Sequence, residues 1–532
     1  MSPQPPNTHL HDELRQSDER VVVETKYGTV KGGRAVNGAG VFLEIPYALP
    51  PGRWEDPKPL PHGFRYTEGK EYIREARYCA QPKNDGQARG TRAFYIYKVG
   101  FGEASENPLF LNIVTPPAFP NSSKGSWPVK VYIHGGFLQF GSPHGLSHQA
   151  QYVSARPGKE AVHVNIGYRL SVFGFLASKD QRLTGNYGFK DQWLALQWVK
   201  ANINGFGGDP ENIQILGLSA GAHSIHQLLH HASQLPEGEK APFVSAIMRS
   251  NAIATTPKTP TELQPQYDAL CAALDLDPSS PETLSSLKDP SKVTAEKLCQ
   301  LIETDKLGIP YGTFRGAFEG SWVREDQDLM GYQSSGSLGK NLLQRGVRNV
   351  VIGDLTEEWY LYSIAHDHIN SRDDVRSNLL RYYRETEVDR MMSGREPVKG
   401  DWVRLFGEIL SDWQVHIPVR MFATDMAKVG FPVLRYVIKW TPEKARESVE
   451  GYVTHGTDSS LWHYRLPSLN PTDVQVADSW LDRIDEELAK IEGGRNLSFL
   501  KDTSQVLVLK EDQTIDWMAD DLWFKRVASA ML

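Results

Sequence analysis

The chain has 532 residues with a formal net charge of −7 at pH 7, and 23% of its residues are charged while 40% are hydrophobic. A net charge this small for the length gives no strongly basic or acidic surface, so we expect no nucleic-acid partner and no attraction to a membrane surface. No long uncharged apolar run is present, which excludes a membrane span and leaves an ordinary soluble composition.

Residues 1–20 are predicted to form a polar N-terminal tail. They begin with M-S-P-Q-P-P and continue with charged residues, without an apolar segment before the first expected strand. A secretory signal peptide needs such a segment, so we expect none in this chain.

Residues 21–221 alternate between apolar, β-rich runs and helical segments. This alternation is typical of a mainly parallel sheet with helices on its faces. The sequence therefore predicts the α/β class, with most of the central sheet built by this part of the chain.

Residues 217–221 read G-L-S-A-G and follow the apolar run 213–216. A serine between two glycines, after a strand and before a helix, is typical of a nucleophile elbow. The sharp turn lifts the serine oxygen out of the sheet and aims the next amides at whatever that oxygen attacks. The flanking glycines leave room for a strained backbone, so we expect Ser219 to be a nucleophile.

Two looser segments, at about 247–348 and 372–427, are predicted to be helical insertions. Polar, proline-containing stretches at 255–260 and 278–281 characterise the first of them. We expect it to fold over the end of the sheet, where folds of this class bind ligands. Between the insertions, the V-V-I-G run at 350–353 predicts a buried strand.

His226 and His230 are one helical turn apart, a spacing that metal ligands also use. A zinc peptidase needs a glutamate beside the first histidine, and this chain has Gln227 there. We favour the simpler interpretation, histidines in the last turn of the elbow helix that face the negative end of its dipole. Residues 205–208 lack the spacing of a dinucleotide loop, so we infer no cofactor and no metal.

Several blocks spread along the chain carry one combined signature. They are T-K-Y-G at 25–28, I-P-Y-A at 45–48, L-N-I at 111–113, Y-R-L at 168–170, F-G-F-L at 173–176, G-N-Y-G-F-K-D-Q at 185–192 and S-A-G at 219–221. Together they resemble the type-B carboxylesterase/lipase family, which includes cholinesterases, fungal lipases and the inactive neuroligins. The resemblance implies a single α/β-hydrolase domain over residues 21–532 and a fungal-type intracellular member.

The family order of catalytic residues is serine, acid, histidine. The T-H-G-T-D block resembles the family's histidine block and selects His455. Counting from Gly353, as the family's acid block counts, places the acid at Glu358, with Glu357 as the alternative. A serine hydroxyl needs such a base, and the base needs an acid to hold its tautomer. Trp359 departs from the glycine that the family usually has at its position.

The H-G-G-F sequence at 134–137 resembles the family's His-Gly-Gly-Gly loop. Position by position, the resemblance assigns the oxyanion-hole amides to Gly136 and Phe137, with Ala220 as the third donor. Phe137 replaces the usual third glycine. Its ring either narrows the acyl pocket, which favours short acyl groups, or turns into the core.

Leu218 stands where many relatives carry the glutamate that helps cholinesterases with a cationic substrate. Its absence argues against choline esters and points to neutral esters.

The chain has three cysteines, Cys79, Cys271 and Cys299. Secreted relatives usually form disulfides whose second cysteines have no counterpart here, which leaves Cys79 and Cys271 unpaired. This fits a reducing, cytoplasmic setting. Two N-x-S sequences, at 121–123 and 496–498, favour the alternative, secretion.

We therefore expect a serine carboxylic-ester hydrolase for small neutral esters, short in their acyl part or natural products. An acyltransferase or lactonase that uses the same residues is one alternative. A silent, neuroligin-like binding protein is another, although such members usually lose the serine or the histidine. The sequence leaves the oligomeric state open.

Overall fold

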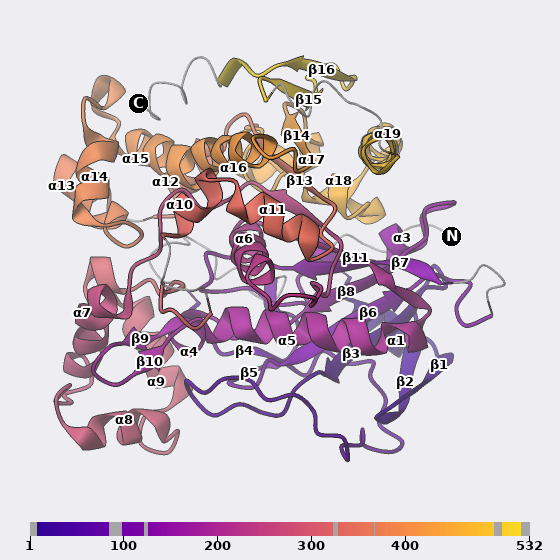
Figure 1. The fold of residues 1–532 in the computed structure, drawn as a ribbon. Coiled ribbons are helices and arrows are strands. Elements are labelled where there is room, and N and C mark those ends of the chain that lie inside the picture. Colours follow the sequence, from indigo (N-terminus) through magenta and orange to yellow (C-terminus); the bar gives the residue numbers. More distant parts are fainter. Residues whose placement is uncertain are drawn as a thin grey trace.

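A long mixed sheet runs through the molecule, with helices packed on both faces (Figure 1). The computed structural model describes residues 8–83, 98–121, 126–322, 328–366, 368–493 and 503–522. The N-x-S sequences at 121–123 and 496–498 lie partly or wholly outside these ranges. Within them the strand order is β1-β2-β3-β6-β8-β7-β11-β12-β13-β14-β15-β16. The bounds are β1 Arg20–Thr25, β2 Gly28–Arg34, β3 Gly40–Pro46, β6 Phe110–Thr115, β7 Trp127–Ile133, β8 Val162–Ile166, β11 Gly208–Leu218, β12 Ser245–Arg249, β13 Asn349–Leu355, β14 Val433–Ile438, β15 Gln505–Leu509 and β16 Ile515–Ala519.

The middle of the sheet is parallel, from β8 through β7, β11, β12, β13 and β14 to β15. The strands at its two edges pair antiparallel. Every residue of β8, β12, β13 and β14 is buried. This is expected for parallel strands that are covered on both faces. The predicted α/β fold with a mainly parallel sheet is confirmed.

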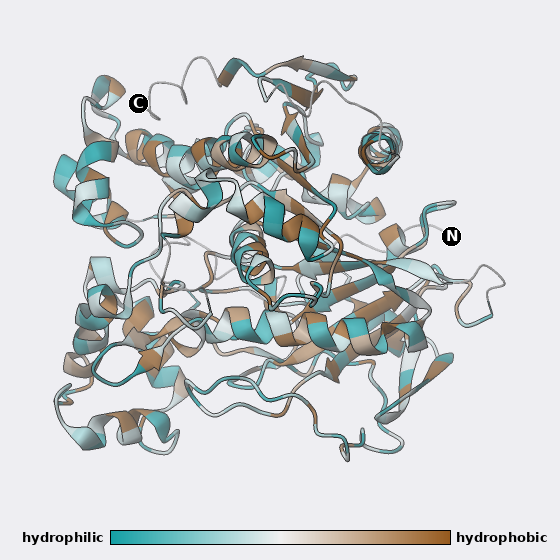
Figure 2. Ribbon diagram, viewed as in Figure 1, coloured by the Kyte–Doolittle hydropathy of each residue, from teal (hydrophilic) through white to brown (hydrophobic). Residues whose placement is uncertain are grey.

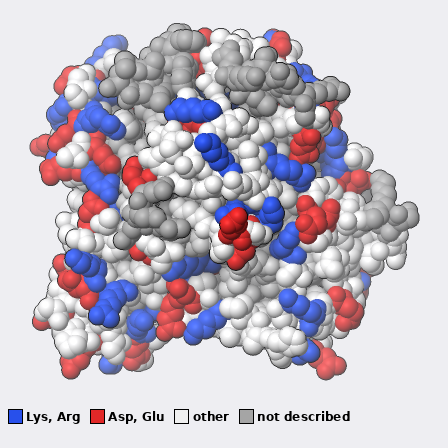
Figure 3. All heavy atoms as spheres, in the orientation of Figure 1, with Lys and Arg blue, Asp and Glu red and all other residues white. Residues whose placement is uncertain are grey.

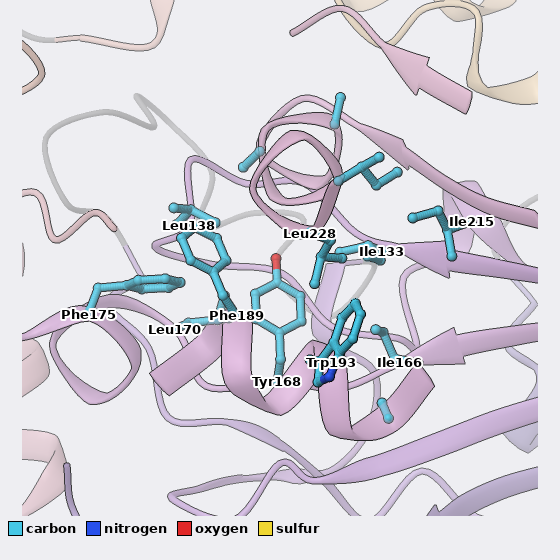
Figure 4. Packing of buried hydrophobic residues seen from close by; sticks show 14 of the residues in the cluster. Ile133, Leu138, Ile166, Tyr168, Leu170, Phe175, Phe189, Trp193, Ile215 and Leu228 are labelled. Atoms are coloured by element: carbon cyan, nitrogen blue, oxygen red, sulfur yellow. The ribbon is translucent and has the colours of Figure 1, made fainter. Parts of the chain in front are cut away.

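Alternate residues of the central strands point to opposite faces of the sheet, and each face has its own core. Ile133 and Ile215 belong to one hydrophobic cluster, whereas their neighbours Tyr132 and Leu216 belong to the other. Figure 4 shows Ile133 and Ile215 beside Leu228 of the elbow helix. In Figure 2 the strands are mostly brown, and the outward sides of the covering helices are teal.

The first core is covered by helices that include the elbow helix, and the second by α3 and by helices from both ends of the chain. The first group is α4 Ser171–Phe175, α5 Tyr187–Asn202, α6 Ala220–Ser233, α10 Leu329–Ser334, α11 Ser337–Gln344 and α16 Ile417–Ala427. The second group is α1 Leu10–Arg15, α3 Gln151–Ser154, α18 Ser459–Trp462 and α19 Pro471–Glu492.

Both segments predicted to be insertions are helical, and their helices α7 to α9, α13 and α14 lie at one end of the molecule, on the left in Figure 1. Residues 247–249, at the predicted start of the first segment, still belong to β12. The added helices are α7 Pro260–Ala272, α8 Pro281–Lys288, α9 Ala295–Glu303, α13 Arg372–Leu379, α14 Glu385–Met392 and α15 Trp402–Ser411.

The N-terminal residues predicted as a polar tail include helix α1. Leu10 and Leu14 of α1 are buried in the second core. The polar letters around them hid this apolar pair, whose spacing of four residues fits one face of a helix.

In the described part of the chain, none of the helices is both long and apolar enough to cross a lipid bilayer.

Candidate active site

The candidate site residues follow the parallel strands β7, β11, β13 and β14, and they lie at the same edge of the sheet, with β12 between β11 and β13. Register aligns Ile133 with Gly217 and aligns Leu218 with Arg249, so the chain leaves β7, β11 and β12 at one level. Parallel strands place their carboxyl ends together, and ligands bind at that edge in folds of this kind. The oxyanion loop, the serine, the acid and the histidine of the prediction all come from these loops.

Ser219 forms a sharp turn between β11 and α6. Residues other than glycine rarely adopt its backbone angles, φ of 83° and ψ of −116°. The turn is held by two backbone hydrogen bonds, in which the Ser219 amide donates to the Arg249 carbonyl (2.9 Å) and the His223 amide donates to the Ser219 carbonyl (2.9 Å). The strained backbone therefore fixes the hydroxyl at the end of the sheet.

Glycines around the serine are required by close backbone contacts. A Cβ on Gly217 would lie 2.5 Å from the Gly221 carbonyl carbon, and one on Gly221 would lie 2.1 Å from the Ile133 carbonyl oxygen. A Cβ on Gly135 would lie 2.5 Å from the Leu218 carbonyl oxygen. The elbow and the loop after β7 thus touch through their backbones.

His455 and Glu358 form a direct contact, although 97 residues separate them in sequence. The distance from His455 Nδ1 to Glu358 Oε2 is 2.7 Å, and both side chains are buried. The other carboxylate oxygen of Glu358 accepts the Leu355 amide at 3.0 Å, which fixes the carboxylate. Nε2 of His455 is buried without a hydrogen-bond partner among the described residues, so it is available to a second group.

The alternative acid, Glu357, does not contact His455 but holds the backbone near it. Its carboxylate accepts the Val453 amide at 2.8 Å, and its own amide donates to the Val453 carbonyl at 3.1 Å. Trp359, which departs from the family pattern, begins helix α12 Trp359–Ile364 with ordinary helical backbone at Glu358 before it. Its ring lies under the Arg404 guanidinium, so the larger residue is accommodated outside the site.

The loop after β7 presents free amides next to the elbow. Among the described residues, the amides of Gly136, Phe137 and Ala220 have no hydrogen-bond acceptor. Gly136 has φ of 114°, and a Cβ there would lie 2.0 Å from the Phe140 carbonyl oxygen. Phe137 also has positive φ, 57°. Free amides at a helix start and a strained loop are the groups that bind developing negative charge.

Two buried glutamines hold this loop in place. The Gln139 side chain donates to the Phe137 carbonyl (3.0 Å) and the Phe314 carbonyl (2.5 Å), and it accepts the Phe314 amide (3.1 Å). The Gln81 side chain bonds both the amide and the carbonyl of Gly141. The sequence prediction missed both residues, because an isolated glutamine carries no pattern that reveals a distant backbone partner.

Ser219 and His455 line one cavity of ≈ 580 Å³ together with Gly136 and Phe137. Leu218 is also in its wall. Apolar groups contribute most of the rest, from residues such as Phe140, Leu146, Leu361 and Ile364.

The sequence left two interpretations open for the Phe137 ring, and the structure combines them. The ring lines the cavity, and it also makes edge contacts with Tyr362 and His366. Tyr362 in turn contacts the His455 ring, at 5.4 Å between centroids. The Phe137 ring therefore belongs to an aromatic wall on one side of the serine.

A buried ion pair lies behind the histidine loop. Arg249 Nη2 is 2.9 Å from Asp458 Oδ1, and both side chains are fully buried. Asp458 follows His455 by three residues, and Arg249 ends the strand next to the serine. The pair ties these two loops together.

The two elbow-helix histidines are buried. His230 lies in the last turn of α6 as predicted, whereas His226 lies earlier in the helix. Both ring nitrogens of His230 lack a hydrogen-bond partner among the described residues. His226 Nδ1 accepts the Ile253 amide at 2.9 Å, and its Nε2 lies 2.8 Å from Gln333 Oε1. His230 stacks on His226. Burial lowers the pKa of His226 to about 4, so this ring is neutral at pH 7.

The three cysteines are free and buried. Burial raises the pKa of Cys271 to about 11 and that of Cys299 to about 12, so these thiols are protonated and unreactive at neutral pH.

A mainly parallel sheet with a strand, sharp turn and helix at Ser219 defines the α/β-hydrolase class. The model of the carboxylesterase family matches residues 19–485. The chain belongs to this family.

Individual relatives agree with this assignment. A carboxylic ester hydrolase of Gibberella moniliformis is 32% identical over 513 residues, which cover 91% of this chain and 89% of that protein. An uncharacterized esterase/lipase of Schizosaccharomyces pombe is 29% identical over 510 residues, covering 91% and 90%. Among solved structures, a PNB esterase has a TM-score of 0.71 and 22% identity, over 96% of this chain and 99% of that chain, which is a likeness of fold. The protein is a hydrolase that acts on carboxylic esters.

Proposed function

We propose that Ser219, His455 and Glu358 are the catalytic triad of this esterase. The observation that carries the proposal is the 2.7 Å contact of His455 with Glu358 in a site where His455 and Ser219 line the same cavity. In this proposal the Glu358 carboxylate accepts a hydrogen bond from the protonated Nδ1 of His455, which leaves Nε2 as the base. The buried and otherwise unpartnered Nε2 supports this role.

In the first half-reaction, the Ser219 oxygen attacks the ester carbonyl carbon while His455 Nε2 takes the hydroxyl proton. The carbonyl oxygen becomes an oxyanion. Collapse of the tetrahedral intermediate breaks the bond to the alcohol oxygen, which takes the proton from His455. In the second half-reaction, His455 Nε2 takes a proton from a water that attacks the acyl carbon. The bond from that carbon to the Ser219 oxygen then breaks, Ser219 regains the proton from His455, and the carboxylic acid leaves.

The amides of Gly136, Phe137 and Ala220 are proposed to hold the oxyanion. They lie in the loop beside the elbow and at the first residue of α6, and all three have free N–H groups among the described residues. Loss of one such donor typically lowers kcat by about 10²–10³.

The apolar wall of the cavity supports a substrate that is uncharged around its ester bond, with a short acyl group on the side of Phe137. The free buried thiols support a reducing, cytoplasmic setting.

The test is hydrolysis of p-nitrophenyl esters from acetate to palmitate by wild type and Ser219→Ala. We expect turnover that is greatest for short chains and that falls by about 10⁴–10⁶ in the variant. An unchanged melting temperature shows that the variant is folded. Turnover by Ser219→Ala at the wild-type rate contradicts the triad. Added alcohols that appear in ester products identify acyl transfer instead of hydrolysis.

A further inference from the structure

The cavity at Ser219 is bounded by residues from both faces of the sheet. Phe137 belongs to the first hydrophobic core, whereas Tyr132 of β7 belongs to the second. Figure 4 shows Ile133, the residue after Tyr132, in the first core, because successive residues of a strand point to opposite faces. Phe137 and Tyr132 both line the cavity, so a substrate at Ser219 meets a different surface on each side.

The surface on the side of the first core is apolar. Leu361 and Ile364 of α12 line the cavity, and the Phe137 ring contacts Tyr362 of the same helix. The side chains of Phe137, Leu361 and Ile364 offer no hydrogen bond. This surface therefore fits the hydrocarbon acyl group that is proposed above for the Phe137 side.

The surface on the side of the second core carries hydrogen-bonding groups. Tyr132, Ser142, Ser147 and His148 all line the cavity. The His148 ring packs on the Tyr132 ring, at 4.8 Å between centroids. Its two nitrogens lie 2.9 Å from the Ser142 carbonyl oxygen and 3.3 Å from the Ser147 hydroxyl. These four residues form one group, which we call the polar wall.

His148 is neutral, so the donors and acceptors around it can be assigned. Burial lowers the pKa of His148 to about 3, which leaves the ring uncharged at pH 7. A carbonyl oxygen only accepts hydrogen bonds, so Nε2 carries the proton and donates to the Ser142 carbonyl. Nδ1 then accepts from the Ser147 hydroxyl, whose oxygen keeps lone pairs for a further donor.

The Tyr132 hydroxyl is buried in the polar wall without a hydrogen bond. Tyr132 is 5% exposed, and its hydroxyl has no hydrogen-bond partner among the described residues. Burial raises the pKa of Tyr132 to about 12, so the hydroxyl stays protonated and can both donate and accept. A buried hydroxyl without a partner is costly, so this position favours a polar group of the substrate.

The charges and the size of the cavity restrict which polar group fits. None of the described residues that line it is Asp or Glu, so a cationic group would meet no counter-charge there. Uncharged hydroxyl groups match the neutral donors and acceptors of Tyr132 and Ser147. The volume of ≈ 580 Å³ gives room for a six-membered ring beside a short acyl chain.

We propose that the polar wall binds the alcohol part of the substrate, so that esters of short acids with polyhydroxy alcohols of monosaccharide size are preferred over esters of apolar alcohols. Tyr132 and Ser147 are then specificity-determining residues. The two branches of an ester leave the carbonyl carbon in different directions, and the acyl branch is already assigned to the Phe137 side. This inference rests on the proposed function.

The experiment compares 6-O-butyryl glucose with cyclohexylmethyl butyrate, whose leaving group has the same ring size and no hydroxyl groups besides the ester oxygen. The quantity measured is the ratio of kcat/KM for the sugar ester to kcat/KM for the cyclohexylmethyl ester. In Tyr132→Phe we expect this ratio to fall about three- to tenfold, the loss of one hydrogen bond. In Ser147→Ala we expect a fall of about two- to fivefold. The matched control is Tyr311→Phe, which removes a hydroxyl from an exposed tyrosine that does not line the cavity and leaves the ratio at the wild-type value.

An equal loss on both esters in Tyr132→Phe leaves the ratio unchanged and overturns the proposal, because it identifies a structural role. A wild-type kcat/KM that is greater for the cyclohexylmethyl ester overturns it as well. A second pair, methyl 3,4-dihydroxybutanoate and methyl 3-methylpentanoate, places the hydroxyl groups in the acyl branch. If Tyr132→Phe lowers the ratio only for this second pair, the assignment to the alcohol part is wrong. If cyclohexylmethyl butyrate is hydrolysed equally by Ser219→Ala, the proposed function fails instead.

Discussion

The two cavities beside the elbow helix differ in what builds them. The cavity at Ser219 is made by loops at the ends of β7, β11, β13 and β14, with backbone amides beside the serine and mainly apolar side chains around them. A second cavity is lined by His223 of the elbow helix and by residues from 251–258, 313–316, 381–387 and 413–414. Its charged side chains are Lys258, Arg315, Arg381, Arg384 and Glu387, whereas the outer face in Figure 3 has Lys and Arg interspersed with Asp and Glu. The sheet sets the geometry of the first cavity, whereas segments distant in sequence form the wall of the second.

This difference separates a site positioned by backbone from a cavity bounded by side chains of distant segments. A sheet edge and strained turns hold atoms to a fraction of an ångström, which catalysis requires. Variants of each region should therefore fail in different ways.

The largest effect is expected from Glu358→Gln. The variant keeps the shape of the side chain but presents an amide to His455. The kcat for hydrolysis of a neutral p-nitrophenyl ester should therefore fall by about 10³–10⁴. The matched control is Glu357→Gln, one residue earlier, whose side-chain oxygen still accepts the Val453 amide. Its kcat should stay within about fivefold of wild type. Steady-state kinetics measure kcat of both variants. An equal loss of kcat in the two variants would contradict the assignment of Glu358 as the acid.

Asp458→Asn should weaken the fold itself. It leaves the fully buried Arg249 without a counter-charge, and breaking such a pair costs about 3–5 kcal/mol of unfolding free energy. Urea denaturation measures the change. Asp389→Asn, which removes a half-exposed pair with Arg376, should stay within about 1 kcal/mol. Similar midpoints for the two variants would show that the buried pair has little weight.

Gln139→Met tests the link between the two regions, because this side chain joins the oxyanion loop to Phe314 of the first insertion. Displacement of the loop amides should lower kcat for a neutral p-nitrophenyl ester by about 10- to 100-fold, with a smaller change in KM. A change confined to KM would place the role of Gln139 in binding.

The sequence led to those candidate residues that a local motif, or the spacing from a recognisable strand, points to. The elbow at Ser219 follows from a local pattern of strand, glycine and helix, and family spacing led to Glu358 although Glu357 is adjacent. Gln139 and Gln81 were not predictable in this way. Their roles depend on which residues of distant segments meet, and no local periodicity or propensity encodes that meeting.

The N-terminal helix shows the same limit at the level of the fold. Its two leucines are the apolar positions that pack on the second core, within a stretch whose polar and proline residues outweigh them. The segment is polar in composition, but Leu10 and Leu14 pack its helix against the second core.

Arg249 links the loops that carry Ser219 and His455. Its carbonyl accepts the Ser219 amide, while its guanidinium holds the aspartate three residues after His455. One residue at the end of one strand thus helps to set the positions of Ser219 and His455 together. Heat or denaturant that loosens this strand end should disable both at once, so enzymatic activity should disappear in a single step, in parallel with the unfolding of the central sheet.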